Sequence, residues 1–278
     1  DIDTLDLCAW TETLCGAAAV ALDKNDWAIA ELDRIAWNAL PAVCQGGLLD
    51  TQSVNQLQAA ADEPANGLIL RMARAWNALT SSHVMIHPDG EPVIIRPTAG
   101  SYSVRLGNTP ARLRIHGTPV AFTIAFEMKA PAEGSLRLRI PEWAEEVSVS
   151  LGRQTLIPDK ADGLLKLRGA WQSGMELQVC FRPRLRMETG FHQSRSLYLG
   201  PWLMALPVTA EDWRQGLAGE PELRDGEVWV KLCGLKEQWK SLEKLPVLPR
   251  SGEPIREVRL QPYSVTAQRL AQLPWVRA

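Results

Sequence analysis

The sequence predicts a multidomain α+β protein in which helices are followed by two antiparallel β-sandwich domains. Up to His83, apolar residues recur at the spacing of a helix face. After His83 the period shortens to that of a strand, and turn residues recur at short intervals. We therefore expect helices over residues 1–83, a first sandwich over 84–187 and a second over 188–278.

Apolar residues at every third or fourth position predict three helices in the first region. The first covers residues 7–21, and the second covers 28–40, where Pro41 ends it because proline cannot continue a helix interior. The third begins at Pro64, since proline is favoured in a first helical turn. Residues 45–61 contain a Gly-Gly pair and several amide side chains, and we expect a loop there.

Short apolar runs between Gly- and Pro-containing turns predict the two sandwiches. A hairpin opens the first one, with strands at 84–86 and 92–95 around a Pro-Asp-Gly-Glu turn. Its further strands are expected at 103–106, 111–116, 121–128, 135–140, 147–151, 164–167 and 176–181. The second sandwich is expected to use 195–199, 202–208, 227–232 and 256–262, with a charged, proline-rich surface excursion over 237–254.

Composition excludes two classes of partner. The 278 residues are 46% hydrophobic and 22% charged, with a net charge of −2 and interspersed signs. This distribution argues against a nucleic-acid surface and against an electrostatic membrane anchor. No apolar run reaches the roughly 18–20 residues of a membrane span. We expect a truncated start at Asp1, so the compartment, cytoplasmic or periplasmic, is left open.

The positions of the cysteines, histidines and tryptophans indicate which roles these residues can have. The five cysteines are widely spread and form no CxxC, which predicts reduced thiols. His83 and His87 are expected to be satisfied loop or edge histidines, because the strand pattern keeps them off one helical face. Most of the 11 tryptophans are expected to pack in cores. Trp10 is the better candidate for stacking on a sugar, whereas Trp37 and Trp76 are expected to pack between helices.

Seven short motifs, in order along the chain, resemble one family. It is glycoside hydrolase family 127, the β-L-arabinofuranosidases of the six-hairpin glycosidase group, once catalogued as domain of unknown function 1680. The motifs are DLCA at 6–9, RIAWNAL at 34–40, PAN at 64–66, LRLRIPEWA at 136–144, WQSG at 171–174, YLGP at 198–201 and LQPY at 260–263.

The resemblance implies that residues 1–83 are the last helices of an (α/α)6 barrel and that the chain corresponds to the C-terminal portion of longer proteins. A few barrel helices would leave apolar faces exposed. We therefore expect either a missing N-terminal half or a partner, such as a second copy in a homodimer, to cover them.

The resemblance also implies a zinc site of one Glu and three Cys, in which one thiolate is the nucleophile and an upstream Glu is the acid/base. Here Asp6 stands at the zinc-binding Glu and Cys8 at the first Cys, but Asp62 and Glu63 replace the paired cysteines. Zinc, although typical of that family, is therefore not expected, and no metal is assigned. The general acid would lie upstream of Asp1.

Three alternatives stay open for these residues. Asp62 and Glu63 are candidate catalytic carboxylates, with Trp10, Asp6 and Cys8 as candidate substrate-binding residues. The same carboxylates would otherwise suit a hard cation such as Ca²⁺, Mg²⁺ or Mn²⁺. In the structural alternative, Asp62 or Glu63 caps the following helix and Cys8 is a small buried residue.

The expected function is that of part of a glycoside hydrolase that acts on glycans or oligosaccharides and lacks the zinc–cysteine set. The alternative is a non-catalytic carbohydrate-binding or interaction protein derived from that family. Whether the chain is an enzyme, which sugar it takes and with what anomeric outcome are left open.

Overall fold

The computed structural model describes residues 26–39, 41, 55–56, 68–208, 214–236, 239, 244–249, 255–265 and 268–276. The chain divides into two compact units. The first unit consists of Cys15–Ala30 and Trp76–Arg184, and the second consists of Asp1–Leu14, Glu31–Ala75 and Leu185–Ala278.

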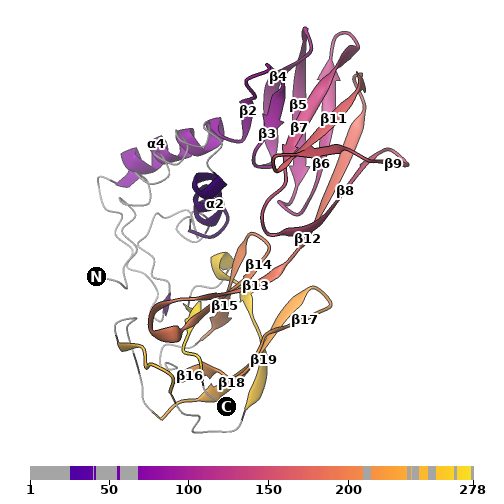
Figure 1. The fold of residues 1–278 in the computed structure, drawn as a ribbon. Helices are drawn as coiled ribbons and strands as arrows, with labels where there is room; N and C mark the ends of the chain where they lie inside the picture. Colours follow the sequence, from indigo (N-terminus) through magenta and orange to yellow (C-terminus); the bar gives the residue numbers. More distant parts are fainter. Residues whose placement is uncertain are drawn as a thin grey trace. The chain divides into compact units, whose positions relative to one another are not determined.

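The first unit contains two sheets (Figure 1). Five strands run in the order β10-β11-β7-β3-β2, and six run in the order β4-β5-β6-β12-β8-β9. The strands are β2 (Val84–Ile86), β3 (Pro92–Ile94), β4 (Gly100–Leu106), β5 (Thr109–Gly117), β6 (Ala121–Met128), β7 (Ala132–Arg139), β8 (Ala144–Leu151), β9 (Gln154–Leu156), β10 (Asp159–Ala161), β11 (Leu164–Trp171) and β12 (Glu176–Pro183).

Every strand predicted in this region is present, but one pairing differs from the antiparallel expectation. β3 and β7 run parallel, with Val93 opposite Arg137 and Ile94 opposite Leu138. Between them the chain passes through β4, β5 and β6 of the other sheet. That long excursion returns the chain in its original direction, as a parallel pair requires.

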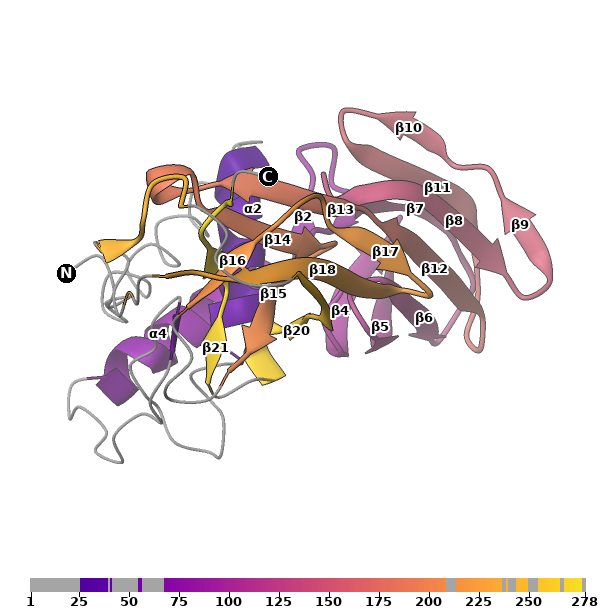
Figure 2. The same ribbon diagram turned by 90° about the horizontal axis from the view of Figure 1, so that it is seen from below.

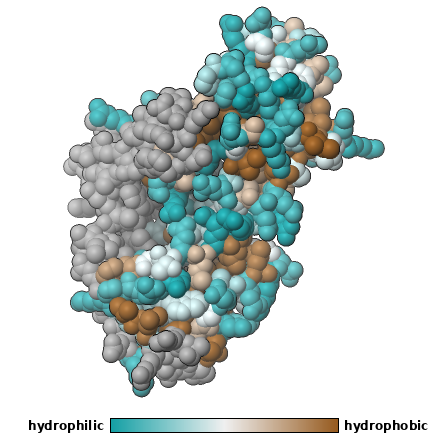
Figure 3. Space-filling model, viewed as in Figure 1, coloured by the Kyte–Doolittle hydropathy of each residue, from teal (hydrophilic) through white to brown (hydrophobic). Residues whose placement is uncertain are grey.

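The core of the first unit lies between its two sheets. Side chains alternate between core and solvent along β5 and β12. The inward side chains of both sheets form one buried cluster, which includes Leu113, Ile124, Phe126, Leu136, Leu165 and Leu177. The two sheets therefore pack face to face, as in a β-sandwich. Hydrophilic residues cover most of the visible outer surface, with apolar ones in small groups (Figure 3).

The second unit is built from shorter strands (Figure 2). One sheet has the order β1-β21-β15-β14-β13, with β20 on β15 and β22 on β14, and the other has the order β16-β18-β17, with β19 on β18. Their bounds are β1 (Asn55–Gln56), β13 (Leu185–Thr189), β14 (Arg195–Leu199), β15 (Trp202–Pro207), β16 (Gln215–Leu217), β17 (Glu222–Arg224), β18 (Glu227–Gly234), β19 (Arg256–Arg259), β20 (Gln261–Pro262), β21 (Arg269–Leu270) and β22 (Gln272–Leu273).

Both sheets of the second unit contribute to one buried cluster. Leu206 and Leu270 come from the first sheet, and Leu217, Val230 and Leu232 come from the other. Trp239, Leu245 and Val276, which lie outside the strands, complete the cluster. Loop residues thus fill space that strands fill in the first unit.

Two α-helices are described. Helix α2 (Asp26–Arg34) continues as a π-helical turn, η2 (Ile35–Ala39), which confirms the helix predicted over 28–40. Helix α4 (Leu68–Ser81) confirms a helix after Pro64, whose first residues lie outside the described part of the chain, as does the whole predicted helix 7–21. Neither described helix is long and apolar enough to cross a bilayer.

Candidate functional site

The residues predicted to form the active site lie outside the described residues. This applies to Asp6, Cys8, Trp10, Asp62 and Glu63. The structure therefore tests neither their convergence on one pocket nor the capping alternative. Among the residues that are described, no three His, Cys, Asp or Glu side chains are grouped so that they could hold a metal ion.

Within the second unit, Asn38 joins the helical segment to the β14–β15 hairpin. Its Nδ2 donates to the carbonyl oxygens of Arg34 and Pro201, both at 3.0 Å. Its Oδ1 accepts the backbone N–H of Leu203 at 2.7 Å. Asn38 is only 6% exposed, so all three hydrogen bonds act away from bulk water. One side chain thus fixes the angle at which the helix meets the hairpin.

The same contact explains the π-helical turn. In an α-helix the Arg34 carbonyl would accept the backbone N–H of Asn38, four residues later. Here the Asn38 side chain donates to that oxygen, and the helix continues from Ile35 with the wider π spacing. The π-helical turn thus lies where the Asn38 side chain bonds both the helix and the hairpin.

Two guanidinium groups flank Tyr198 beside this joint. Arg34 and Arg186 lie 5.5 and 5.3 Å from the centre of the Tyr198 ring. Arg34 Nη2 donates to both oxygens of Glu188, at 3.0 and 3.2 Å, and Arg186 Nη1 donates to one of them at 3.4 Å. Burial, aided by Glu188 and opposed by the two arginines, raises the pKa of Tyr198. Tyr198 is therefore a neutral packing residue at neutral pH, not a base.

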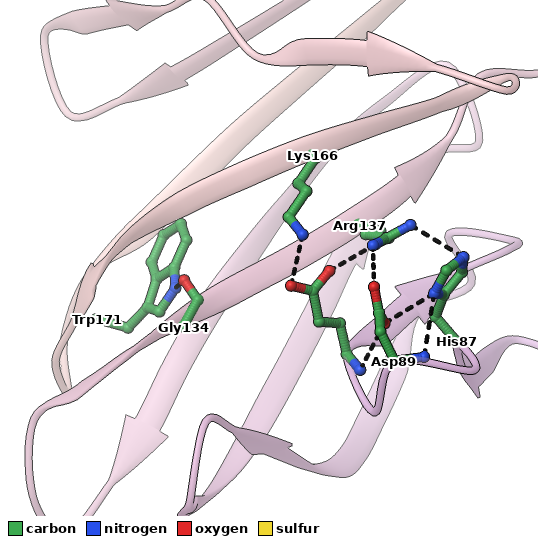
Figure 4. A network of polar contacts seen from close by, with 7 residues as sticks. His87, Asp89, Gly134, Arg137, Lys166 and Trp171 are labelled. Carbon is green, nitrogen blue, oxygen red and sulfur yellow. Dashed lines mark hydrogen bonds and ion pairs between the residues drawn. The ribbon is translucent and has the colours of Figure 1, made fainter.

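A second polar network lies on the first unit, where the β2–β3 turn meets β7 and β11 (Figure 4). Arg137 Nε and Lys166 Nζ each donate to one oxygen of Glu91, both at 2.6 Å. Arg137 also donates to Asp89. Burial raises the pKa of Glu91, but hydrogen bonds from Lys166, Arg137 and Ser135 outweigh it, so the pKa lies below its usual value. Glu91 therefore stays ionised and clamps the turn to the sheet.

His87 belongs to this network through both of its ring nitrogens. Arg137 Nη1 lies 3.0 Å from His87 Nε2, and arginine can only donate, so Nε2 accepts. His87 Nδ1 lies 2.7 Å from Asp89 Oδ1 and 3.4 Å from the backbone nitrogen of Asp89. His83, which is buried, bonds the Tyr102 hydroxyl through Nδ1 at 3.0 Å. Both histidines are satisfied by protein groups, as predicted.

The usual carboxylate mechanism of glycoside hydrolysis uses two carboxyl groups that face the substrate. In both networks, Arg or Lys groups already pair the carboxylates, so the networks hold structure in place rather than perform that chemistry. A shallow, open hollow of about 350 Å³ lies on β7 and β11 of the first unit and is lined by Glu133, Gly134, Ser135, Arg168, Gly169 and Ala170. It brings no two carboxylates together.

Sequence reasoning missed the role of Asn38, although a signal was present. Asparagine is disfavoured in helix interiors because its side chain competes for backbone hydrogen bonds. Its presence inside the predicted helix 28–40 therefore marked a position with a tertiary partner. That partner is the hairpin turn at Pro201, so the motifs at 34–40 and 198–201 contact each other.

One family model matches part of the chain. Residues 115–182 match the family model described as β-L-arabinofuranosidase, GH127 middle domain. No curated protein sequence matches the chain.

Solved structures match over more of the chain. A GH127 β-arabinofuranosidase matches 98% of this chain and 49% of its own, with a TM-score of 0.74 at 14% identity. A GH127 β-L-arabinofuranosidase from Geobacillus stearothermophilus T6 matches 98% and 48%, with a TM-score of 0.67 at 13% identity. A structure described as a glycoside hydrolase matches 79% and 41%, with a TM-score of 0.57 at 13% identity.

The chain thus spans about half the length of the first two structures it matches. At identities this low, the likeness establishes the fold and says nothing of substrate. Residues 115–182 thus match the GH127 middle domain, and the fold of the chain is that of part of the GH127 structures, in agreement with the resemblance to a GH127 C-terminal portion that the motifs indicate.

Proposed function

We propose that this chain is the C-terminal portion of a glycoside hydrolase that acts on glycans or oligosaccharides. The observation that carries the proposal is the GH127 middle-domain match together with a GH127-like fold over 98% of the chain. In this proposal residues 1–83 are the last helices of an (α/α)6 barrel, and residues 84–187 and 188–278 are two β-sandwich domains. The rest of the barrel, or a second copy, would cover the helices.

The residue set does not fit the zinc–thiolate chemistry of the resembled family. A nucleophilic thiolate on zinc needs soft sulfur ligands. Asp6, Asp62 and Glu63 supply hard carboxylate oxygens, and Cys8 is the only sulfur ligand among the four positions. We therefore derive no step through zinc.

The carboxylates can supply an alternative chemistry. One of Asp62 and Glu63 would act on the anomeric carbon or on water, and a carboxylic acid would protonate the leaving oxygen. Trp10 would stack on the sugar, and Asp6 and Cys8 would contact it. The second candidate function is that of a non-catalytic carbohydrate-binding or interaction protein. The absence of paired cysteines at 62–63 favours it as much as it favours a hydrolase with carboxylate chemistry.

One experiment separates the two candidates. The natural protein containing this chain is assayed for release of p-nitrophenol from aryl α- and β-L-arabinofuranosides and other aryl glycosides. For a hydrolase, Asp62→Asn or Glu63→Gln lowers kcat by about 100- to 10,000-fold, and Cys8→Ser is far milder. Glycan binding without turnover would support the second candidate. Stoichiometric zinc in metal analysis would contradict the proposed chemistry.

A further inference from the structure

We propose that the outer face of the β17–β18–β19 sheet, centred on Trp229, is a non-catalytic binding platform for a neutral saccharide. The choice of ligand class rests on the proposed function. The platform itself consists of described residues of the second unit: Glu222, Arg224, Trp229, Lys231 and Glu257.

The strand register places Trp229 at the centre of this face. Val228 and Val230, on either side of it, are 0% and 2% exposed and belong to the core. Because side chains alternate along a strand, Trp229 points outward. It lies opposite Glu222 of β17 and Arg259 of β19. The indole is half-buried, and the Arg224 guanidinium lies over it.

Trp229 differs from the other half-buried tryptophans described on this unit. Trp202 and Trp275 pack against the core cluster, and Arg195 covers Trp275 at 5.0 Å. Trp229 is not among the residues packed on that cluster. A large apolar ring held on an outer sheet face, away from the core, is a surface for stacking rather than a core residue.

Charged side chains hold two carboxylates beside the ring. Arg224 donates to Glu222 at 3.0 and 2.7 Å and to Glu257 at 2.9 and 3.1 Å. Its guanidinium carbon lies 5.7 Å from the indole centre, and Lys231 lies 3.5 Å from Glu222. Hydrogen bonds from Arg224 lower the pKa of Glu222 and of Glu257, so both carboxylates stay ionised acceptors.

This arrangement suits a neutral polyhydroxylated ring. The C–H face of a sugar stacks on an indole, and each carboxylate keeps lone pairs that accept hydroxyl hydrogens after pairing with Arg224. The charges nearly balance, which disfavours a polyanion such as nucleic acid or polyuronate. They are three cations, Arg224, Lys231 and Arg259, against four carboxylates, Glu220, Glu222, Glu227 and Glu257.

Arg224 governs access to the ring. The hollow lined by these residues is closed in this structure, with Arg224 among its walls. A saccharide would therefore shift the guanidinium along the ring while keeping at least one of its carboxylate contacts. Exposed ion pairs of this kind are weak, so the shift costs little.

The test is isothermal titration of the natural protein with arabinotriose and xylotriose as furanose and pyranose probes, and with trigalacturonate as the charged probe. We expect binding of a neutral trisaccharide that Trp229→Ala weakens about tenfold or more. Trp229→Phe should retain part of the binding, because a smaller ring remains. The control variant, Glu127→Gln, alters an exposed ion pair of the first unit and should bind like the unaltered protein.

The outcomes distinguish this platform from the proposed hydrolase. Trp229-dependent binding with no turnover would support the platform and overturn the hydrolase. Turnover of aryl glycosides by a protein whose neutral trisaccharide binding is absent, or is unchanged in Trp229→Ala, would overturn the platform alone. Tighter binding of trigalacturonate than of the neutral probes would also contradict it. Circular dichroism checks that each variant is folded.

Discussion

The two units bury their cores by different means. The first unit packs long strands whose alternating side chains meet between two sheets, and most of its core residues lie in those strands. The second unit has several strands of two or three residues, and Trp239, Leu245 and Val276 complete its core from outside them. Packing between the two sheets stabilises the core of the first unit, whereas individual tertiary contacts stabilise the core of the second unit.

Buried polar residues occur in both units, among them Arg96 of the first and Arg269 of the second. In the second unit Arg269 is 0% exposed, and its guanidinium lies 3.8 Å from the centre of the Tyr263 ring. Burial raises the pKa of that tyrosine, against the effect of Arg269. Such groups must be satisfied individually, because a buried charge without partners is costly. The second unit should therefore be more sensitive to loss of one hydrogen-bonding side chain than to loss of one methyl group.

The largest expected effect comes from breaking the sheet-to-sheet packing of the first unit. Trp171 is 2% exposed, stacks on Phe126 with ring centres 4.7 Å apart, and donates to the Gly134 carbonyl at 3.0 Å. Trp171→Ala leaves a large cavity and should lower the free energy of unfolding by about 3–5 kcal/mol. Denaturant unfolding followed by hydrogen exchange of strand peptides measures this loss and locates it.

The variant Trp171→Phe separates the contribution of ring packing from that of the hydrogen bond to Gly134. Phenylalanine keeps the stack on Phe126 but lacks the N–H donor to Gly134, so only part of the loss should appear. If alanine and phenylalanine proved equally destabilising, the hydrogen bond rather than the packing would dominate. The contrast drawn between the units would then be wrong.

A smaller effect is expected from the joint of the second unit. Asn38→Ala removes three hydrogen bonds and leaves the Pro201 carbonyl and the Leu203 N–H buried without their partner. Unsatisfied buried groups of this kind cost about 2–3 kcal/mol in total. Faster amide exchange at residues 198–203 should accompany the loss. Asn77→Ala, an exposed asparagine on α4, is the control and should change stability little. Unchanged exchange in Asn38→Ala would show that the joint does not hold the hairpin.

The sequence predicted the strands of the first unit well because each long strand carries its own alternating pattern. β9, β10 and β17 were missed, since short exposed polar segments show no alternation. In the second unit β1, β13, β16, β21 and β22 were missed as well, and most of these are only two or three residues long. The parallel β3–β7 pair could not be foreseen, because register between distant strands depends on the whole topology. At the functional site, the predicted residues lie outside the described ones, whereas Asn38 and Trp229 gain their roles only from partners far along the chain.

The smallest expected effect on stability comes from the contact of Glu91 with Arg137 and Lys166, which holds the β2–β3 turn on the sheet. This effect depends on pH. The pKa of Glu91 is lowered from 4.5 in the folded chain. A carboxyl group with a lowered folded pKa stabilises the fold above its unfolded pKa and loses that contribution as pH falls through the folded value. Glu91→Gln should therefore cost about 1 kcal/mol near pH 7 and progressively less below about pH 4.5.

The matched control is Glu127→Gln, which removes an ion pair with Arg114 whose side chains are 60% and 41% exposed. Solvent screens such a pair, so this variant should unfold like the unaltered protein across the pH range. Unfolding curves from about pH 3 to pH 7 test both variants. A constant deficit for Glu91→Gln at every pH would mean that the side chain acts by packing alone, and the clamp would then not be electrostatic. A deficit that fades on acidification would show that the β2–β3 turn depends on ionised Glu91, a single polar side chain, much as the β14–β15 hairpin of the second unit depends on Asn38.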